Sequence, residues 1–263
     1  MDKGEVLMSG LLKGKNILIM GVANKRSIAW GIAQELHKHG ANLAFTYVGE
    51  RSLSNLEKLL GEEMKNAKVY ECDVTNDDNV AQVFGQLKED IGVLHGLVHS
   101  IAHSKKEELG GNFYDTSRDG FKLANDISAY SFVLATKYAQ EIMTEGGSIL
   151  TLTYLGSERA IPNYNVMGVA KAALEASTRY LAKDLGEREI RVNAISAGPI
   201  KTLAARGVKD FNDLLKQAEE KIPRGRTVDP KEVGGTAVFL CSDLSTGVTG
   251  EVIHVDAGFS MVG

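Results

Sequence analysis

Residues 16–33 read NILIMGVANKRSIAWGIA, and this stretch decides the fold. The apolar run Asn16–Met20 predicts a short buried strand, and a helical pattern of apolar residues begins at Ala29. Between them Gly21 opens a turn that ends at Ser27. A strand, a tight turn and a helix in this order place backbone N–H groups and a helix N-terminus against a phosphate. The stretch predicts a parallel α/β unit with a dinucleotide site at its turn; an ordinary strand–helix turn is the alternative.

The glycines of this turn do not spell the usual G-x-G-x-x-G pattern. Gly21 is followed by five residues and then by Ser27, with Ala29 and Gly31 after it. We expect Ser27 to cap the helix and to donate to a phosphate, with Ile28 beside it at the cofactor. We expect Ala29 and Gly31 to let the helix approach the sheet closely.

Six further apolar runs repeat the strand pattern, and helical patterns separate them. The runs are Ala41–Tyr47, Lys68–Cys72, Gly96–Ser100, Ser148–Leu152, Arg191–Ile195 and Val252–Val255. The helical stretches are Ala29–His39, Ser52–Lys65, Asp77–Glu89, Ile127–Met143, Val166–Leu185 and Lys231–Ser242. This alternation predicts one α/β domain over residues 1–263. It is a Rossmann-like, doubly wound, seven-stranded parallel sheet with helices on both faces.

The composition is that of an ordinary globular protein, with 43% apolar and 24% charged residues among 263. A net charge of −4 gives no reason to expect a nucleic-acid partner. No apolar run approaches the ~18 residues that span a bilayer, and the first residues lack a signal peptide's apolar stretch. The two cysteines, Cys72 and Cys241, are too few for a disulfide framework. We therefore expect a cytoplasmic protein with no membrane partner.

Open α/β sheets bind ligands at the carboxyl ends of their strands, so the residues there are candidates. Asp73 after the third strand either contacts an adenine or caps the next helix. After the sixth strand, the backbone near Ile200 is placed to bind a nicotinamide amide, and Thr202 to bind a phosphate. The residues assigned to the cofactor at these strand ends are Asp73, Val74, Ser100, Ile101, Ile200 and Thr202.

The second strand decides between the two nicotinamide cofactors. An acidic residue at its end holds the ribose 2′-hydroxyl of NAD, and an Arg often holds the phosphate of NADP. Glu50 and Arg51 are both present, and neither sits directly at the strand end. Since Val48 and Gly49 offer no basic group, the sequence favours NADH, with NADPH as the alternative.

Tyr164 and Lys171 are the candidate reactive pair. In a helix over Tyr164–Arg179, seven residues at about 100° each bring both side chains to one face. A cation beside a phenol favours a proton donor or an oxyanion stabiliser, which suits a substrate carbonyl that gains negative charge. Tyr154 ends the preceding apolar run. A chance pair on an amphipathic face is the alternative.

With these residues assembled, the chain resembles the short-chain dehydrogenase/reductase superfamily over nearly its whole length. More closely, it resembles the bacterial enoyl-acyl-carrier-protein reductases. Typical members of the superfamily pair a serine with Tyr-x-x-x-Lys, but the residue four before Lys171 is Met167. Tyr164-x6-Lys171 with Tyr154 near the serine place marks the enoyl reductase branch. The other matching stretches are Gly21–Ala33, Arg191–Thr202 and His254–Phe259.

The resemblance implies an NADH-dependent reduction of the trans-2 double bond of enoyl thioesters carried by acyl carrier protein. Hydride reaches the β-carbon, and Tyr164 stabilises the enolate oxygen. Lys171 holds the cofactor ribose and strengthens the tyrosine as a donor, and Tyr154 lines the acyl pocket. The implied catalytic residues are thus Tyr154, Tyr164 and Lys171, and the implied assembly is a homotetramer.

The substrate side is implied to include a lid at about 196–220. The apolar wall and lid around the acyl chain comprise Met167, Ala204, Ala205, Val208 and Phe211. Ser104, in the loop after the fourth strand, is a further substrate-binding candidate. A basic cluster near the lid is a candidate docking site for the acidic carrier protein, with ordinary surface charge as the alternative. It comprises Lys201, Arg206, Lys209, Arg224 and Arg226.

Three other interpretations fit the sequence less well. A short-chain reductase acting on a ketone or alcohol is disfavoured by Met167 in the usual tyrosine place. A nicotinamide-sensing module without turnover needs neither the Tyr164/Lys171 pair nor a lid. His95, His99 and His103 stand four apart, but a strand at this position separates them too widely for a metal site.

Overall fold

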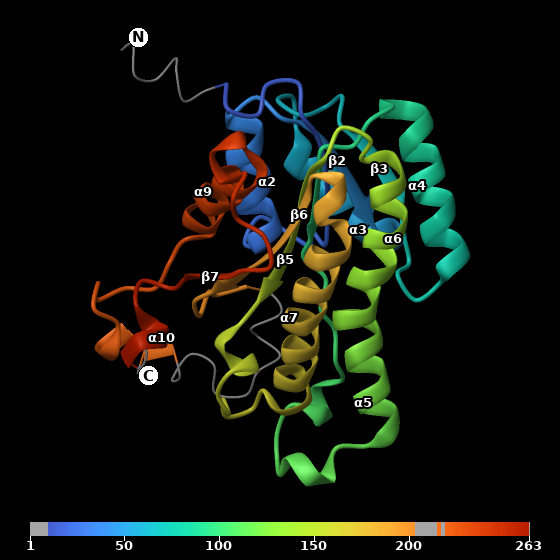
Figure 1. The fold of residues 1–263 in the computed structure, drawn as a ribbon. Coiled ribbons are helices and arrows are strands. Elements are labelled where there is room, and N and C mark those ends of the chain that lie inside the picture. The colour runs from blue at the N-terminus through green and yellow to red at the C-terminus, as the bar shows by residue number, and fades with distance from the viewer. Residues whose placement is uncertain (1–9, 203–214, 217–218, 263) are drawn as a thin grey trace.

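The computed structural model describes residues 10–202, 215–216 and 219–262, and a seven-stranded parallel sheet forms its centre (Figure 1). The strand order is β3-β2-β1-β4-β5-β6-β7, so the chain builds outward from β1, returns, and continues in the other direction from β4. The predicted doubly wound fold is confirmed. The strands are β1 (Asn16–Met20), β2 (Asn42–Tyr47), β3 (Lys68–Glu71), β4 (Gly96–His99), β5 (Gly147–Thr153), β6 (Ile190–Ala197) and β7 (Val252–Val255).

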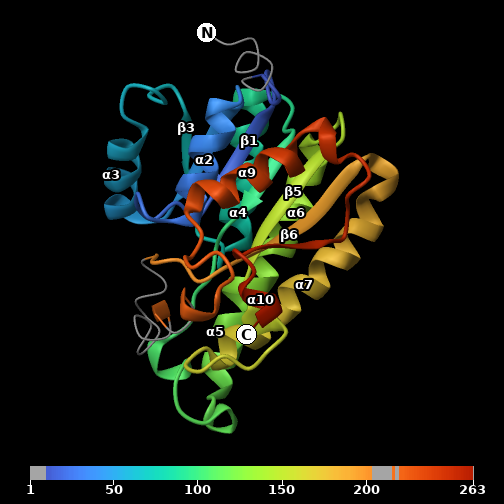
Figure 2. The ribbon, with the colours of Figure 1, turned by 90° about the vertical axis from the view of Figure 1, so that its left-hand side faces the viewer.

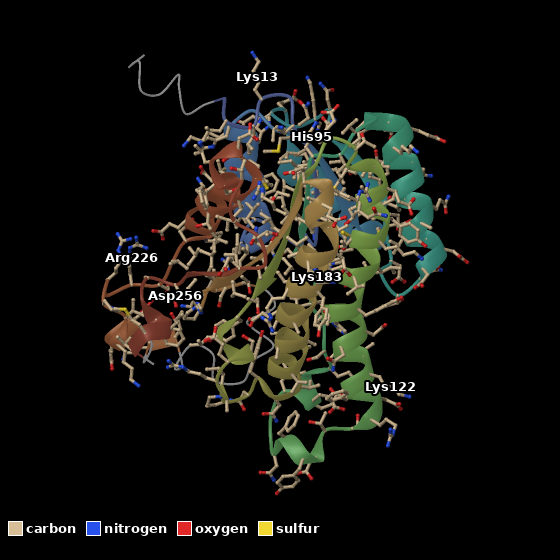
Figure 3. The ribbon with its side chains drawn as sticks, in the orientation of Figure 1. Lys13, His95, Lys122, Lys183, Arg226 and Asp256 are labelled. Atoms are coloured by element: carbon tan, nitrogen blue, oxygen red, sulfur yellow. The ribbon has the colours of Figure 1, made fainter. Side chains whose placement is uncertain are left out.

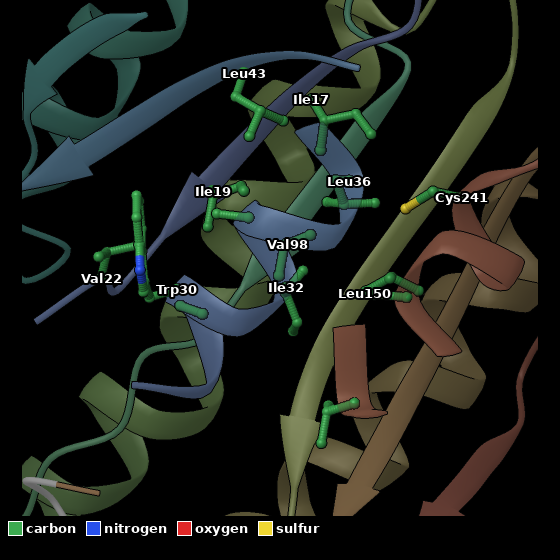
Figure 4. Packing of buried hydrophobic residues seen from close by; sticks show 14 of the residues in the cluster. Ile17, Ile19, Val22, Trp30, Ile32, Leu36, Leu43, Val98, Leu150 and Cys241 are labelled. Atoms are coloured by element: carbon green, nitrogen blue, oxygen red, sulfur yellow. The ribbon is translucent and has the colours of Figure 1, made fainter. Parts of the chain in front are cut away.

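Helices cover both faces of the sheet because alternate strand residues are apolar on both sides. One core holds Ile17 and Ile19 of β1 and is covered by α2 (Ile28–Lys38), α3 (Gly49–Leu60) and α9 (Pro230–Cys241). Figure 4 shows part of this core, with these strand residues beside Ile32 and Leu36 of α2.

The second core holds the alternate residues, Leu18 and Met20, beneath α4 (Asp77–Ile91), α6 (Ser131–Ile142) and α7 (Asn165–Leu185). Shorter elements connect the layers. They are α5 (Arg118–Asn125), α10 (Phe259–Val262), the π-helical turn η3 (Asp126–Tyr130), and the 3-10 turns η1 (Lys106–Glu108), η2 (Phe113–Asp115), η4 (Leu155–Ser157), η5 (Gly186–Arg188) and η7 (Asp243–Ser245). Within the described residues, no helix combines the length and apolarity needed to cross a bilayer.

The closest helix contact on the first face joins α2 to α9, side by side in Figure 2. A Cβ atom at Gly31 would lie 2.4 Å from the Cβ atom of Pro230, and one at Gly234 would lie 2.8 Å from the carbonyl oxygen of Gly31. Gly31 therefore brings its helix against another helix, and the expectation that it approaches the sheet is wrong.

Other boundaries differ from the sequence prediction for local reasons. Helix α3 ends before Gly61, whose φ of +50° is unfavourable for a residue with a side chain, although the predicted helix ran on to Lys65. Helix α5 was not predicted, because only Gly120 and Ala124 of its eight residues are buried. Strand β6 continues to Ala197, so the segment after it begins later than expected.

Candidate active site

The point where the strand order reverses lies between β1 and β4, and the backbones come very close there. Gly21 has a φ of +93°, and a Cβ atom on it would lie 2.0 Å from the carbonyl oxygen of Ser100. Only glycine fits this position. The side chain of Ile101 lies against the same spot, with its Cγ1 atom 3.4 Å from that Cβ position. The structure thus brings Gly21, Ser100 and Ile101 together at the edge where such sheets bind ligands.

Helix α2 begins at this edge without a side-chain cap. Ser27 occupies the N-cap position, but its hydroxyl donates to the carbonyl oxygen of Asn24. The expected capping bond by Ser27 is therefore wrong. The N–H groups of the first turn, which begins at Ile28, are left without this capping acceptor, and such a helix start attracts phosphate. The turn fits a dinucleotide pyrophosphate.

At the end of β3, Asp73 accepts hydrogen bonds from the backbone N–H of Thr75 at 3.0 Å and from its hydroxyl at 2.7 Å. Asn76, and not Asp73, caps α4, so the capping alternative for Asp73 is wrong. Val74 packs at the rim of the second core. At the far side of the site, Ile200 is buried and its carbonyl oxygen accepts the N–H of Thr202 at 2.7 Å.

Tyr154 and Tyr164 meet at the carboxyl end of β5. Their ring centroids are 5.1 Å apart in an edge-to-face arrangement. Tyr164 is the N-cap residue of α7, so the helix begins one residue after Tyr164 and one residue before the predicted stretch Val166–Leu185. Two glycines, whose roles the sequence did not reveal, allow the approach. A Cβ atom at Gly156 would lie 2.5 Å from the Tyr164 ring, and one at Gly168 would lie 2.6 Å from the carbonyl oxygen of Gly156.

Burial keeps both phenols protonated. It raises the pKa of Tyr154 to about 12. Burial raises the pKa of Tyr164 still further above its ordinary value, and the neighbouring Tyr154 adds to the effect. Both side chains are therefore hydrogen-bond donors at neutral pH, as the stabilisation of an oxyanion requires.

Lys171 is buried on α7, and its Nζ atom donates to the carbonyl oxygen of Leu152 at 2.6 Å. Burial lowers the pKa of its ammonium group to about 8, against the opposing effect of Glu175. Glu175 is itself buried one turn further along α7, and its carboxylate accepts hydrogen bonds from Thr153 and Ser157. Glu175 could not be identified from the sequence, because its position in the helix pattern does not reveal its burial.

The loop after β4 is held against α7 on the substrate side. Leu109 packs with Met167 and Ala170, and Tyr164 lies against this cluster. Asn165 donates from its side chain to the carbonyl oxygen of Gly110 at 3.1 Å. Leu109 was missed, because nothing in the loop's polar sequence shows that it folds back.

Of the other residues predicted to bind the substrate, Ser104 donates its hydroxyl to the carbonyl oxygen of Lys105 at 3.3 Å. Four lid residues lie outside the described residues: Ala204, Ala205, Val208 and Phe211.

The histidines of the β4 region have other partners. His99 is buried, with its Nε2 atom 2.8 Å from the hydroxyl of Ser131. His95 accepts the backbone N–H of Asn16 at 3.0 Å. No cluster of metal-ligating side chains occurs in the part of the chain that the structure describes.

Known proteins resemble the chain over nearly its full length. A family model described as Enoyl-(Acyl carrier protein) reductase matches residues 21–260. The enoyl-[acyl-carrier-protein] reductase [NADH] FabI of Bacillus subtilis (strain 168) is 57% identical over 253 residues, which cover 96% of this chain and 98% of that protein. The [NADPH] FabI of Staphylococcus aureus (strain MRSA252) is 55% identical over 252 residues, covering 95% and 98%.

Solved structures agree with this result. The crystal structure of the Bacillus cereus enoyl-acyl carrier protein reductase with NADP+ and indole naphthyridinone superposes with a TM-score of 0.93 at 56% identity. The match covers 97% of this chain and 99% of that one. The strand topology, the close approach at Gly21 and the pair Tyr154–Tyr164 are consistent with this similarity. The chain therefore belongs to the enoyl-[acyl-carrier-protein] reductase family of the short-chain dehydrogenase/reductase superfamily.

Proposed function

We propose that the chain reduces the trans-2 double bond of enoyl thioesters on acyl carrier protein to the saturated acyl thioester, using NADH. The observation that carries the proposal is the close pair of partly buried, neutral phenols: Tyr154 directly after β5, and Tyr164 at the start of α7, the helix that also bears Lys171. Family membership gives the reaction class. The paired tyrosines supply the hydrogen-bond donor that the developing oxyanion needs.

When bound, the nicotinamide supplies a hydride for the β-carbon of the substrate. Tyr164 donates a hydrogen bond to the thioester oxygen, where negative charge collects. Lys171 binds the ribose hydroxyls through its ammonium group and keeps a positive charge beneath the tyrosine. Tyr154 lines the acyl pocket, with Met167 and Leu109 on the wall beside Tyr164. The proton for the α-carbon comes through Tyr164 or from water.

The cofactor site is proposed at the strand ends described above, from Gly21, Ser27 and Ile28 to Ile200 and Thr202. The choice of NADH rests on Glu71, whose Oε1 atom accepts the backbone N–H of Gly49 at 3.1 Å. Glu71 is the last residue of β3 and pairs with Tyr47, so its carboxylate lies beside the end of β2, where a 2′-phosphate would bind, and like charges repel. NADPH is therefore the poorer cofactor.

A direct assay tests the reaction. Loss of NADH absorbance is followed with a trans-2-enoyl thioester, with NADPH in parallel and Tyr164→Phe as the control. Rapid oxidation of NADH that the mutation strongly reduces supports the proposal. Cofactor binding without oxidation would overturn it and would favour a ketone reductase or a nicotinamide sensor.

Docking of the acidic carrier protein is proposed on the basic cluster. Arg226, on the outside of the molecule in Figure 3, binds Glu232 through two contacts of 2.7 and 2.9 Å, and Arg224 lies 3.8 Å from the same carboxylate. Among the described members, Lys201 therefore carries the proposal.

Lys201→Glu should raise KM for the carrier-bound substrate more than for a short thioester. Lys183→Glu on α7, also labelled in Figure 3, is the matched control. Equal effects of Lys201→Glu on both substrates would contradict the docking role.

A lid that follows β6 and runs to about residue 220, a single domain over 1–263, a cytoplasmic location and a homotetramer complete the proposal. The tetramer is supported by large side chains exposed on adjoining elements, Phe121 on α5, Tyr130 on η3 and Tyr180 on α7. Light scattering on the purified protein measures the assembly, and Tyr180→Asp should weaken it. A monomer at micromolar concentration would refute the tetramer.

A further inference from the structure

Glu175 is a buried carboxylate to which the mechanism above assigns no role. Only 8% of its surface is exposed, and a charged side chain is seldom buried so deeply unless it is paired or hydrogen-bonded. None of the ion pairs among the described residues includes it. Its stabilising contacts are hydroxyl groups instead.

These hydroxyls stand on either side of Tyr154 in the chain. Thr153, the last residue of β5, donates to the Oε1 atom of Glu175 at 2.6 Å, and Ser157, the last residue of η4, donates to the same atom at 2.5 Å. The backbone N–H of Ser157 also donates to the carbonyl oxygen of Tyr154 at 3.0 Å. The carboxylate thus fixes both ends of the short turn that presents the Tyr154 ring to Tyr164.

The same helix holds the end of β5 at two successive residues. Lys171 donates to the carbonyl oxygen of Leu152, and Glu175, one turn later on the same face, accepts from Thr153. We propose that Glu175 is a positioning residue of the reductase. It acts on Tyr154 through Thr153 and Ser157, and on Lys171 through its negative charge. This inference rests on the proposed roles of Tyr154, Tyr164 and Lys171.

The surrounding titratable groups make Glu175 the charge that acts on Lys171. His99 on β4 also interacts with Lys171. Its pKa is lowered to about 3, mainly by burial and secondly by the positive charge of Lys171, so His99 stays neutral. On β5 and at the start of α7, Tyr154 and Tyr164 are neutral phenols. Glu175 opposes the burial that lowers the pKa of Lys171 to about 8. Removing its charge should lower that pKa further.

The test compares three variants of the full chain by kcat, by kcat/KM for NADH from pH 6 to 10, and by thermal midpoint. Glu175→Gln keeps the shape and an acceptor oxygen but removes the charge. In the pH profile of kcat/KM, the alkaline limb of Glu175→Gln should lie about one pH unit lower than that of the wild type. At a pH on this limb, kcat/KM should therefore be about tenfold lower than in the wild type. Glu175→Asp keeps the charge and should restore the position of the limb. Ser157→Ala keeps the charge but frees the turn, so it should lower kcat about threefold without moving the limb.

Two results would overturn the inference. One is a Glu175→Gln enzyme with unchanged kcat and an unchanged limb. The other is a lower thermal midpoint in Glu175→Gln with a limb that does not move, which is what a purely structural carboxylate would give. Tyr164→Phe is measured alongside. Full activity in Tyr164→Phe would refute the proposed function, whereas its inactivity beside an unaffected Glu175→Gln refutes only the role of Glu175.

Discussion

The two halves of the candidate site are built by different means. At the ends of β1 and β4, the site is made of backbone: Gly21 lies against the carbonyl oxygen of Ser100, and the first turn of α2 lacks a side-chain cap. At the end of β5, it is made of side chains, with Tyr164, Lys171 and Glu175 arranged along α7. The first half should therefore be damaged by an added methyl group, and the second by a removed polar atom.

The largest effect should come from the side-chain half. Tyr164→Phe removes the donor to the developing oxyanion, and loss of one such donor lowers kcat about 10²- to 10³-fold. The Kd for NADH should change less than about twofold, because the Tyr164 hydroxyl is proposed to act on the substrate oxygen in the transition state and not on the cofactor. Steady-state kinetics and NADH fluorescence measure the two. Tyr154→Phe, which leaves the proposed donor in place, should lose much less, and equal losses in both variants would contradict the assignment.

The backbone half should respond most to Gly21→Ala. The new Cβ atom would meet the carbonyl oxygen of Ser100 at 2.0 Å, in a backbone conformation with φ of +93°. Strain at such positions costs about 1–3 kcal/mol, so the Kd for NADH should rise about 5- to 150-fold. Calorimetric titration measures this. Gly14→Ala is the matched control, because Gly14 has a φ of +79° with nothing within 4 Å. If both variants bind NADH alike, close approach at Gly21 is not what forms the site.

The same division explains how much could be predicted from the sequence. The strands and the Gly21 turn were predicted because local patterns of apolar residues and glycine encode them. Glu175, Leu109 and Gly156 were missed, because their roles depend on contacts with residues distant in the chain. Gly31 was assigned to the wrong partner for the same reason: a glycine indicates a close approach without saying to what.

Alkaline pH should separate activity from stability. Above pH 8, the ammonium group of Lys171, which is proposed to bind the cofactor, loses its proton. The value of kcat/KM should therefore fall about tenfold per pH unit. Stability changes with the opposite sign. The folded pKa lies below the ordinary 10.5, so between about pH 8 and 10.5 the unfolded chain binds the extra proton. The free energy of unfolding should therefore rise by about 1 kcal/mol per pH unit from this group.

Urea titrations of the wild type and Lys171→Met at pH 8 and 9 isolate this contribution. The difference between the two proteins should grow with pH in favour of the wild type. A difference that is the same at both values would mean that Lys171 does not titrate in this range.

The smallest effect should be on cofactor choice. Glu71→Gln removes an exposed charge beside Gly49, and exposed charges contribute about 0.2–1 kcal/mol. The ratio of kcat/KM for NADPH to that for NADH should rise about two- to fivefold. Glu50→Gln is the control within the same segment. If this ratio changes equally in both variants, the cofactor preference depends on the total charge of the region and not on Glu71 itself.

The contact between α2 and α9 has a consequence for how the protein is made. Gly31 and Gly234 form this contact across about 200 residues of chain, and α9 covers apolar residues of the first core. At about 5–20 residues per second, a ribosome takes roughly 10–40 seconds to travel from one helix to the other. Throughout that interval the nascent chain contains its first strands and α2, but it lacks α9, which covers their apolar residues in the folded protein. The growing chain therefore has an incomplete apolar face that chaperones would bind, and a message truncated before α9 would yield a chain prone to aggregation.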